Sequence, residues 1–419
     1  MHKKNSSLLS NRNFWLLAIG QGLSRLGDGL YVAALAWTAW ELTRSLQTVA
    51  IVTLASNLPV FVGSVIGASF ADRYDRKRIM MGCDLLRVLL VATLPLLLSL
   101  GWLDVTGLTV VAVLLGIAGT PFAPARNALV PQVVPADALL SANGLLQVSF
   151  RAAYFVGPLL LAPLVAFLSL PDVFLVDAAT FVCSIGTLAL MRIPANTSPT
   201  SRPGLWADLL AGWQALRLAP EVQVVITTFV LAILIASGFL TVGVIALVNT
   251  QLHGSAGQYG FLLGIAGLAE VVGALILTRL PLRNLALSAV LAWAVLGVFR
   301  LPLGFVTVLP GAAVLLGLTG MLSALTDIPL IALVQSQIAQ RHLAKVLGLW
   351  EAGIIGAMSV SPLLASFILT HIGLQGGFVL SGATLIVLGS ASALLVVRIQ
   401  AKQRKTRAAS RVTSSRSLA

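Results

Sequence analysis

The stretch GASFADRYDRKR, residues 67–78, forms a short charged loop between two apolar runs, 46–70 and 79–101. Each run has the length of about 20 residues that a helix needs to cross the hydrocarbon core of a bilayer. The composition of the chain agrees with this, because 58% of its 419 residues are hydrophobic and only 10% are charged, whereas soluble domains carry about 25% charged residues. A water-soluble domain is therefore excluded.

Apolar runs of this kind recur along the whole chain, each bounded by charges, Pro, Gly or Asn. Their pattern predicts an all-α membrane protein with twelve transmembrane helices. The boundary between the ninth and tenth runs, around Pro302 to Pro310, is marked least clearly. The twelve runs are 13–40, 46–70, 79–101, 107–128, 141–168, 172–192, 221–250, 256–278, 285–304, 309–334, 345–370 and 374–397.

The distribution of Lys and Arg predicts the orientation, because short cytoplasmic loops retain positive charge. With the N-terminus inside, 22 of the 27 Lys and Arg residues fall in cytoplasmic segments, Arg126 among them. Only Arg44 and Arg300 fall in outer loops. We therefore expect both termini in the cytoplasm.

The net charge of +13 does not indicate nucleic-acid binding, because the cations are spread over alternate loops. The basic tail from Arg398 to Arg416 is expected to lie against anionic lipid headgroups. Cys83 and Cys183 lie within apolar runs and lack metal-ligand spacing. Neither GxGxxG nor GxxxxGK[ST] occurs, so we expect no cofactor, no bound metal and no nucleotide as energy source.

The two halves of the chain share one plan. Segments 128–130 and 332–334 both read ALV, segments 158–160 and 362–364 both read PLL, and each pair is 204 residues apart. Such a repeat predicts two parallel six-helix halves with a substrate site between them. The predicted parts are the N-terminal half (1–192), a cytoplasmic connector with an amphipathic helix (193–220), the C-terminal half (221–397) and a basic tail (398–419).

Charged residues inside the apolar runs are candidates for function, because a charge near the bilayer centre is costly. Arg25 and Asp28 share one face of the first helix, and Asp28 is flanked by glycines. We expect Asp28 to couple proton movement to transport. Asp84 and Arg87 repeat the spacing and are expected to form a structural ion pair. The other candidates for proton coupling or the substrate cavity are Arg151, Glu270, Asp327 and Glu351.

The 67–78 loop resembles the signature loop of the major facilitator superfamily. Together with PARNALVPQVVP (124–135) and SANGLL (141–146), it resembles the efflux branch that includes macrolide efflux proteins, the enterobactin exporter and related multidrug permeases. The resemblance implies a latch that holds one conformation, formed by Gly67, Asp72, Arg73, Arg76 and Lys77. The alternative is a simple positive anchor, which explains the basic residues but leaves the acid unexplained.

The resemblance implies a bacterial inner-membrane exporter, not an enzyme, that releases a small amphipathic molecule by proton antiport with alternating access. A metal-ion or metal-chelate exporter and a lipid flippase are the alternatives, although few His and Cys residues are present to bind a soft metal. The expected partners are a small-molecule substrate, protons and the lipid bilayer. We expect no nucleic acid and a monomeric protein.

Overall fold

A computed structural model of the chain describes residues 11–66, 75–135, 138–192 and 205–416. Every regular element in these ranges is helical, which confirms the predicted fold class. Nine helical segments of the described ranges are long and apolar enough to cross a membrane. The count of twelve spans stays a prediction.

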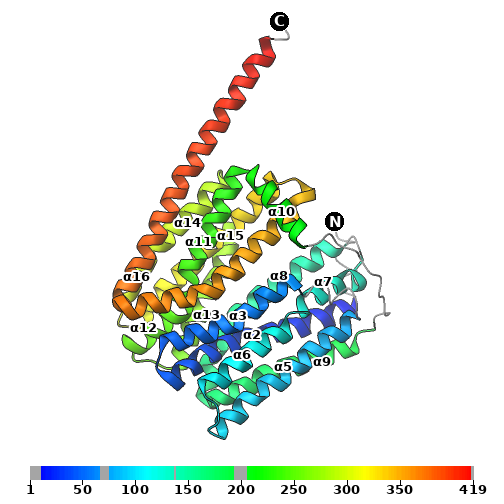
Figure 1. The fold of residues 1–419 in the computed structure, drawn as a ribbon, viewed down its shortest axis with the longest axis vertical. Helices are drawn as coiled ribbons and strands as arrows, with labels where there is room; N and C mark the ends of the chain where they lie inside the picture. The colour runs from blue at the N-terminus through cyan, green and yellow to red at the C-terminus, as the bar shows by residue number, and fades with distance from the viewer. Residues whose placement is uncertain (1–10, 67–74, 136–137, 193–204, 417–419) are drawn as a thin grey trace.

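The helices form one elongated bundle in which successive segments run up and down (Figure 1). The first group of helices in chain order is α2 (Arg12–Thr43), α3 (Leu46–Ile66), α5 (Arg76–Ser99), α6 (Val105–Gly119), α7 (Phe122–Val133), α8 (Leu139–Phe167) and α9 (Leu170–Leu190). The connecting helix is α10 (Leu205–Arg217). The second group is α11 (Pro220–Gly238), η2 (Phe239–Gly243), α12 (Val244–Thr250), α13 (Ala256–Leu277), α14 (Leu285–Arg300), η3 (Leu301–Phe305), α15 (Leu309–Gln337) and α16 (Gln340–Arg416).

Three hydrophobic cores show how the two groups meet. One core combines both groups, with Leu30 and Phe174 from the first and Phe239 and Tyr259 from the second. The second core lies entirely between residues 216 and 396, and the third lies between 14 and 191. The groups therefore share a core at one end of the bundle, here called the joined end. At the opposite end, the two-core end, each group packs around its own core.

Contacts between α8 and its neighbours bring the backbones close together at the joined end. A Cβ atom at Gly157 would lie 2.5 Å from the carbonyl oxygen of Leu26, and one at Gly260 would lie 2.5 Å from that of Pro158. Only glycine permits such an approach, as small residues do between membrane helices. The rings of Trp37 and Tyr259 also stack across the groups, with centroids 5.7 Å apart.

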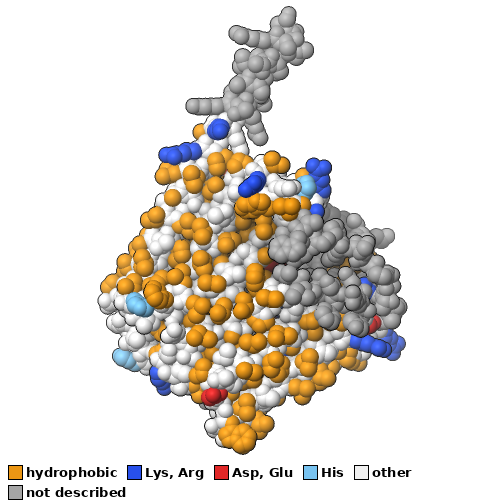
Figure 2. Space-filling model, viewed as in Figure 1, with side chains coloured by type: hydrophobic (Ala, Val, Ile, Leu, Met, Phe, Trp, Pro, Cys, Tyr) orange, Lys and Arg blue, Asp and Glu red, His pale blue; other side chains and the backbone are white. Residues whose placement is uncertain are grey.

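The surface is that of a membrane-embedded bundle. Large side chains such as Leu89, Leu275 and Val387 are more than half exposed, and hydrophobic side chains are spread over the described part of the face in Figure 2. Lys and Arg side chains on this face gather mainly toward the end from which α16 projects. An apolar belt with cations at one end is typical of proteins that cross a bilayer.

The structure corrects several boundaries. The predicted run 107–128 is two helices, α6 and α7, separated at Thr120 and Pro121. The predicted run 221–250 contains a π-helix, η2, a rare form that is frequent at functional sites. The boundary near Pro302 is a short 3₁₀ helix, η3, after which α15 starts at Leu309.

The last two predicted runs, 345–370 and 374–397, both lie in α16, which consists of two helices that meet at a bend. The backbone is non-helical at Gly373, with a φ of 74° that residues with a side chain rarely adopt, so the predicted division between the two runs is confirmed. Beyond the bend α16 continues as a helix to Arg416, so the residues expected to form a separate tail extend the last helix and project from the bundle (Figure 1).

The predicted connector contains the expected helix, α10, whereas residues 193–204 lie outside the described ranges. Leu216 is buried in the core of the second group, and Gly212 lies against the backbone of Lys345. Leu210 and Trp213 are 58% and 41% exposed. The helix therefore packs against the start of α16 and still presents apolar side chains outward.

Candidate functional site

Polar side chains gather where α2, α5 and α9 pack together, inside the first group of helices. They form what we call the N-terminal polar cluster, in which three carboxyl groups are accompanied by two guanidinium groups. Its members are Gln21, Arg25, Asp28, Asp84, Arg87, Asp177, Thr180 and Ser184.

The accessible part of the cluster is the pair on α2. Arg25 Nη1 lies 3.5 Å from Asp28 Oδ2, and the two side chains are 37% and 27% exposed. The three-residue spacing on one helix face accounts for this geometry. Both side chains of this pair are therefore partly exposed, although they lie next to the buried polar groups of the cluster.

The second pair lies deeper. Asp84 is fully buried, with Oδ1 3.9 Å from Arg87 Nη1, and its Oδ2 accepts a hydrogen bond of 2.7 Å from the Ser184 hydroxyl. The Ser184 hydroxyl in turn accepts a 3.4 Å hydrogen bond from the side-chain amide of Gln21. The predicted ion pair is thus one part of a chain of polar groups that joins α5, α9 and α2.

Arg87 is held by aromatic rings as well as by its acid. Its guanidinium carbon lies 5.2 Å from the ring centre of Phe122 and 5.3 Å from that of Phe181. Cations interact favourably with ring faces at such distances. Because Phe122 is the first residue of α7, Arg87 links the break between α6 and α7 to the cluster.

Asp177 is the third carboxyl group of the cluster. It is 1% exposed, and within the described residues it makes no ion pair and its Oδ2 accepts no hydrogen bond. A Cβ atom at Gly27 would lie 2.2 Å from Asp177 Oδ1, so a glycine on α2 creates the space that this acid occupies. Asp177 lies close enough to Asp28 and Arg87 for their charges to interact.

Arg126 is a correction to the sequence prediction. It was expected in a cytoplasmic loop, but it lies half-buried within α7. Its charge interacts with that of Arg25 on α2 and with that of Glu351 on α16. The charge of Glu351, from the second group, attracts that of Arg126, and the charge of Arg25 repels it. The structure thereby connects the predicted residues Arg25 and Glu351 through a residue that the charge pattern had assigned elsewhere.

Arg300 is a second correction. It was expected in an outer loop, but it ends α14 and is 7% exposed. Its Nη2 donates a 2.6 Å hydrogen bond to the carbonyl oxygen of Ala236, and its guanidinium lies 5.6 Å from the ring centre of Phe239. The hydrogen bond and the ring compensate for the burial of the charge beside the π-helix η2.

The remaining interior candidates are dispersed. Glu270 is half-buried on α13 and Asp327 is buried on α15, and both have interaction partners in the structure. Arg151 lies on α8, but its side chain is outside the described part of the chain. Glu270 and Asp327 belong to helices of the second group, whereas the N-terminal polar cluster lies within the first. In the described ranges no three His, Cys, Asp or Glu side chains are grouped to hold a metal ion.

The predicted latch is only partly described. Gly67, Asp72 and Arg73 lie outside the described residues. Arg76 is buried at the start of α5, and the Lys77 ammonium donates hydrogen bonds of 3.0 and 2.8 Å to the carbonyl oxygens of Ala189 and Met191. Lys77 therefore caps the end of α9 and ties two helices of the first group together.

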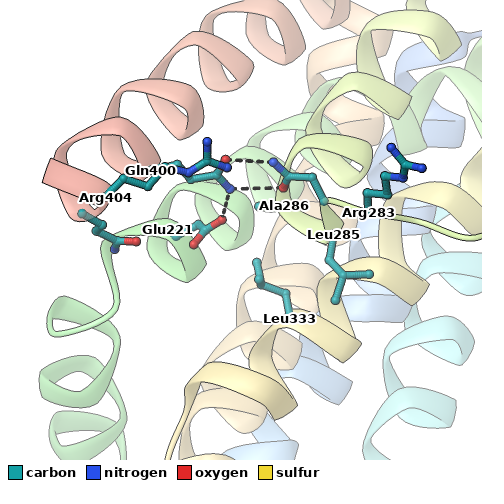
Figure 3. Close-up of a pocket in the computed structure, with 9 residues that line it drawn as sticks. Glu221, Arg283, Leu285, Ala286, Leu333, Gln400 and Arg404 are labelled. Atoms are coloured by element: carbon teal, nitrogen blue, oxygen red, sulfur yellow. Dashed lines mark hydrogen bonds between the residues drawn. The ribbon is translucent and has the colours of Figure 1, made fainter. Parts of the chain in front are cut away.

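A polar network at the two-core end was not anticipated. The Glu221 carboxylate, 6% exposed at the start of α11, accepts hydrogen bonds from the side-chain amides of Gln337 and Gln400. Gln400 also exchanges hydrogen bonds of 2.8 and 3.1 Å with Asn284. The network joins α11, α14, α15 and the extension of α16, and Figure 3 shows the part of it around Glu221 and Gln400.

Removal of an amide from this network is expected to destabilise the second group of helices. Gln337→Leu or Gln400→Leu takes a donor from a buried carboxylate, which costs about 1–3 kcal/mol, and lowers the midpoint of thermal unfolding. Gln403→Leu is the control, because Gln403 lines the same pocket without bonding to Glu221. Equal midpoints for all three variants would contradict a stabilising role for the network.

Comparison with known proteins agrees with this architecture. The chain is 27% identical over 383 residues to the multidrug efflux pump Tap of Mycolicibacterium fortuitum, which covers 88% of this chain and 92% of that protein. It is 31% identical over 196 residues to macrolide efflux protein A of Streptococcus pyogenes, covering 46% and 47%. It is 26% identical over 371 residues to the enterobactin exporter EntS of Escherichia coli O6:K15:H31, covering 83% of each.

Solved structures share the fold at low identity. The nucleoside transporter NupG superposes with a TM-score of 0.72 at 14% identity and covers 92% of this chain and 99% of its own. A peptide transporter POT superposes with a TM-score of 0.70 at 13% identity, covering 95% and 99%. The model of the transmembrane secretion effector family matches residues 5–417. The chain therefore belongs to the transmembrane secretion effectors, a family of the major facilitator superfamily.

Proposed function

We propose that this protein is a secondary active exporter that carries a small amphipathic molecule, such as a drug or a siderophore, out of a bacterial cell in exchange for protons. The relatives named for multidrug, macrolide and enterobactin efflux support the direction and the class of substrate. The N-terminal polar cluster is the observation that carries the choice of coupling ion.

The balance of charge in the cluster favours proton coupling. Three carboxyl groups accompany two guanidinium groups, and an uncompensated charge inside a membrane protein is costly. The surplus carboxyl group is therefore a natural proton carrier. Within the described residues Asp177 forms no ion pair, so it is the surplus carboxyl group and we assign it the proton held inside the cluster. Asp28 is the member open to its surroundings, so we assign it the exchange of protons with solvent, while Asp84 and Arg87 remain an ion pair.

The energy available from a proton is sufficient for export. One proton that enters down a potential of about 100 mV contributes about 2.3 kcal/mol. This free energy supports a solute gradient of about 50-fold.

The packing of the two groups supports alternating access. The shared core closes the joined end, whereas among the described residues the two-core end has a separate core in each group. We place the substrate between the groups, where the charge of Arg126 of the first group interacts with that of Glu351 of the second. Transport then requires that the contacts at the joined end break while others form at the two-core end.

The cations support an inward-facing assignment. Several basic residues belong to segments at the two-core end: Arg76, Lys77, Arg217, Arg283 and Arg404. Because positively charged loops stay in the cytoplasm, this end is assigned to the cytoplasmic side. Both termini are then cytoplasmic. We retain the division into halves at 1–192 and 221–397, the latch at the 67–78 loop and a monomeric protein as parts of the proposal.

The direct test is expression in a bacterial strain that lacks its own efflux pumps. The protein is expected to lower the accumulation of at least one compound in a panel of macrolides, tetracyclines, dyes, siderophores and nickel, relative to cells with an empty vector. A protonophore that collapses the proton gradient should abolish the difference. Unchanged accumulation of every compound would contradict export, and export that persists without the gradient would contradict proton antiport.

A further inference from the structure

The pocket above the Glu221 network has the features of a ligand site, and it lies outside the N-terminal polar cluster. Its volume is about 320 Å³, which is at the lower end of the range for small-ligand pockets. The side chains around it come from the starts of α11 and α14 and from the extension of α16. They are Glu221, Arg283, Asn284, Leu285, Ala286, Leu333, Gln400, Gln403 and Arg404.

The electrostatic balance of the pocket favours an anion. Arg283 and Arg404 stand on opposite sides of the network (Figure 3). Both side chains are exposed, and within the described residues neither forms an ion pair. The one acid, Glu221, lies at the buried floor, where amides occupy both of its oxygens. The lining of the pocket therefore carries two guanidinium groups and one carboxylate that is already hydrogen-bonded.

The position of the pocket identifies the source of the anion. It lies where α11 and α14 begin and where α16 leaves the bundle, so polar side chains lie next to span-end residues such as Leu285 and Leu333. A phospholipid combines a phosphate with apolar chains and matches this arrangement. Guanidinium groups bind phosphate oxygens in a bidentate manner, and basic pockets between membrane helices accept lipid headgroups.

We propose that this pocket binds the phosphodiester headgroup of an anionic phospholipid through Arg283 and Arg404. The bound lipid joins the extension of α16 to the start of α14 and thereby stabilises the second group of helices. The site is independent of the proposed proton coupling, since none of its residues belongs to the N-terminal polar cluster.

Thermal unfolding of the full-length protein in a neutral detergent tests the proposal. Short-chain phosphatidylglycerol is expected to raise the unfolding midpoint, whereas phosphatidylcholine with the same chains is not. Arg404→Gln or Arg283→Gln should each weaken the apparent affinity by about tenfold or more, because each removes charge-assisted hydrogen bonds. Arg279→Gln is the matched control, since it removes the same charge from the same loop without lining the pocket.

Inorganic phosphate distinguishes the source of the anion. A lipid site is supported if phosphatidylglycerol raises the unfolding midpoint and phosphate alone does not. Only the two pocket variants should then lose this rise in the midpoint. An equal shift with phosphate alone would overturn the lipid assignment in favour of a soluble anion. An unchanged response in the double variant Arg283→Gln/Arg404→Gln, or equal shifts with both lipids, would overturn the site itself. The unliganded midpoint of each variant verifies that the exposed substitutions leave the fold intact.

Discussion

Asp28→Asn is expected to abolish the coupling of proton movement to export. Asn keeps the size of the side chain and much of its hydrogen bonding but cannot carry the charge, and it leaves Arg25 without its acid. Loss of the contribution of one proton lowers the attainable substrate gradient by about 50-fold at about 100 mV. Downhill exchange of substrate should persist, because exchange requires the conformational change without net proton transfer.

Proton release on addition of substrate to proteoliposomes measures this coupling directly. Asp172→Asn is the matched control, since Asp172 is an acid at the start of α9 whose capping role Asn can share. The control should release protons as the unaltered protein does. A normal signal from Asp28→Asn would place the coupling acid elsewhere, with Asp177, Glu270, Asp327 and Glu351 as the next candidates.

Gly260→Ala is expected to shift the protein away from the conformation in which the joined end is closed. The added Cβ would lie 2.5 Å from the carbonyl oxygen of Pro158, a backbone atom that cannot move aside alone. Overpacking of this kind costs about 1–3 kcal/mol, which changes a conformational equilibrium by about 5- to 150-fold. Export should fall accordingly, because the cycle then lacks one of its two states.

Spin labels at Phe167→Cys and Phe305→Cys report the separation of the two groups at the joined end, in a background with Cys83 and Cys183 replaced. The distance distribution should move to longer values in Gly260→Ala. Gly186→Ala is the control, since a Cβ there meets no atom within 4 Å. If both variants give the distribution of the parent, the glycine contact does not control closure.

Much of the fold could be predicted because apolar length and the positions of charges are properties of the sequence. The ion pairs Arg25/Asp28 and Asp84/Arg87 could also be predicted, since three-residue spacing on one helix forces the side chains together. The interruptions at Thr120 and at Phe239–Gly243 were missed, because a break or a π-helix within an apolar run leaves its hydrophobicity unchanged.

Contacts between side chains on different helices were the main feature that residue spacing within one helix could not predict. Asp177 belongs to the cluster through a glycine on another helix, and Glu221 depends on amides more than 100 residues away. Arg126 and Arg300 were assigned to loops because the orientation rule counts cations near the ends of apolar runs. That rule takes no account of an acid, an aromatic ring or a carbonyl oxygen on a neighbouring helix, with which a buried arginine can interact.

The extension of α16 has a practical consequence for measurement in living cells. Residues 398–416 continue the helix and, at 1.5 Å per residue, span about 28 Å. A fluorescent protein or an affinity tag attached after Arg416 is therefore held away from the rest of the helical bundle. Such a fusion can quantify the protein in each variant strain, whereas an insertion before Gln400 would separate that residue from Glu221.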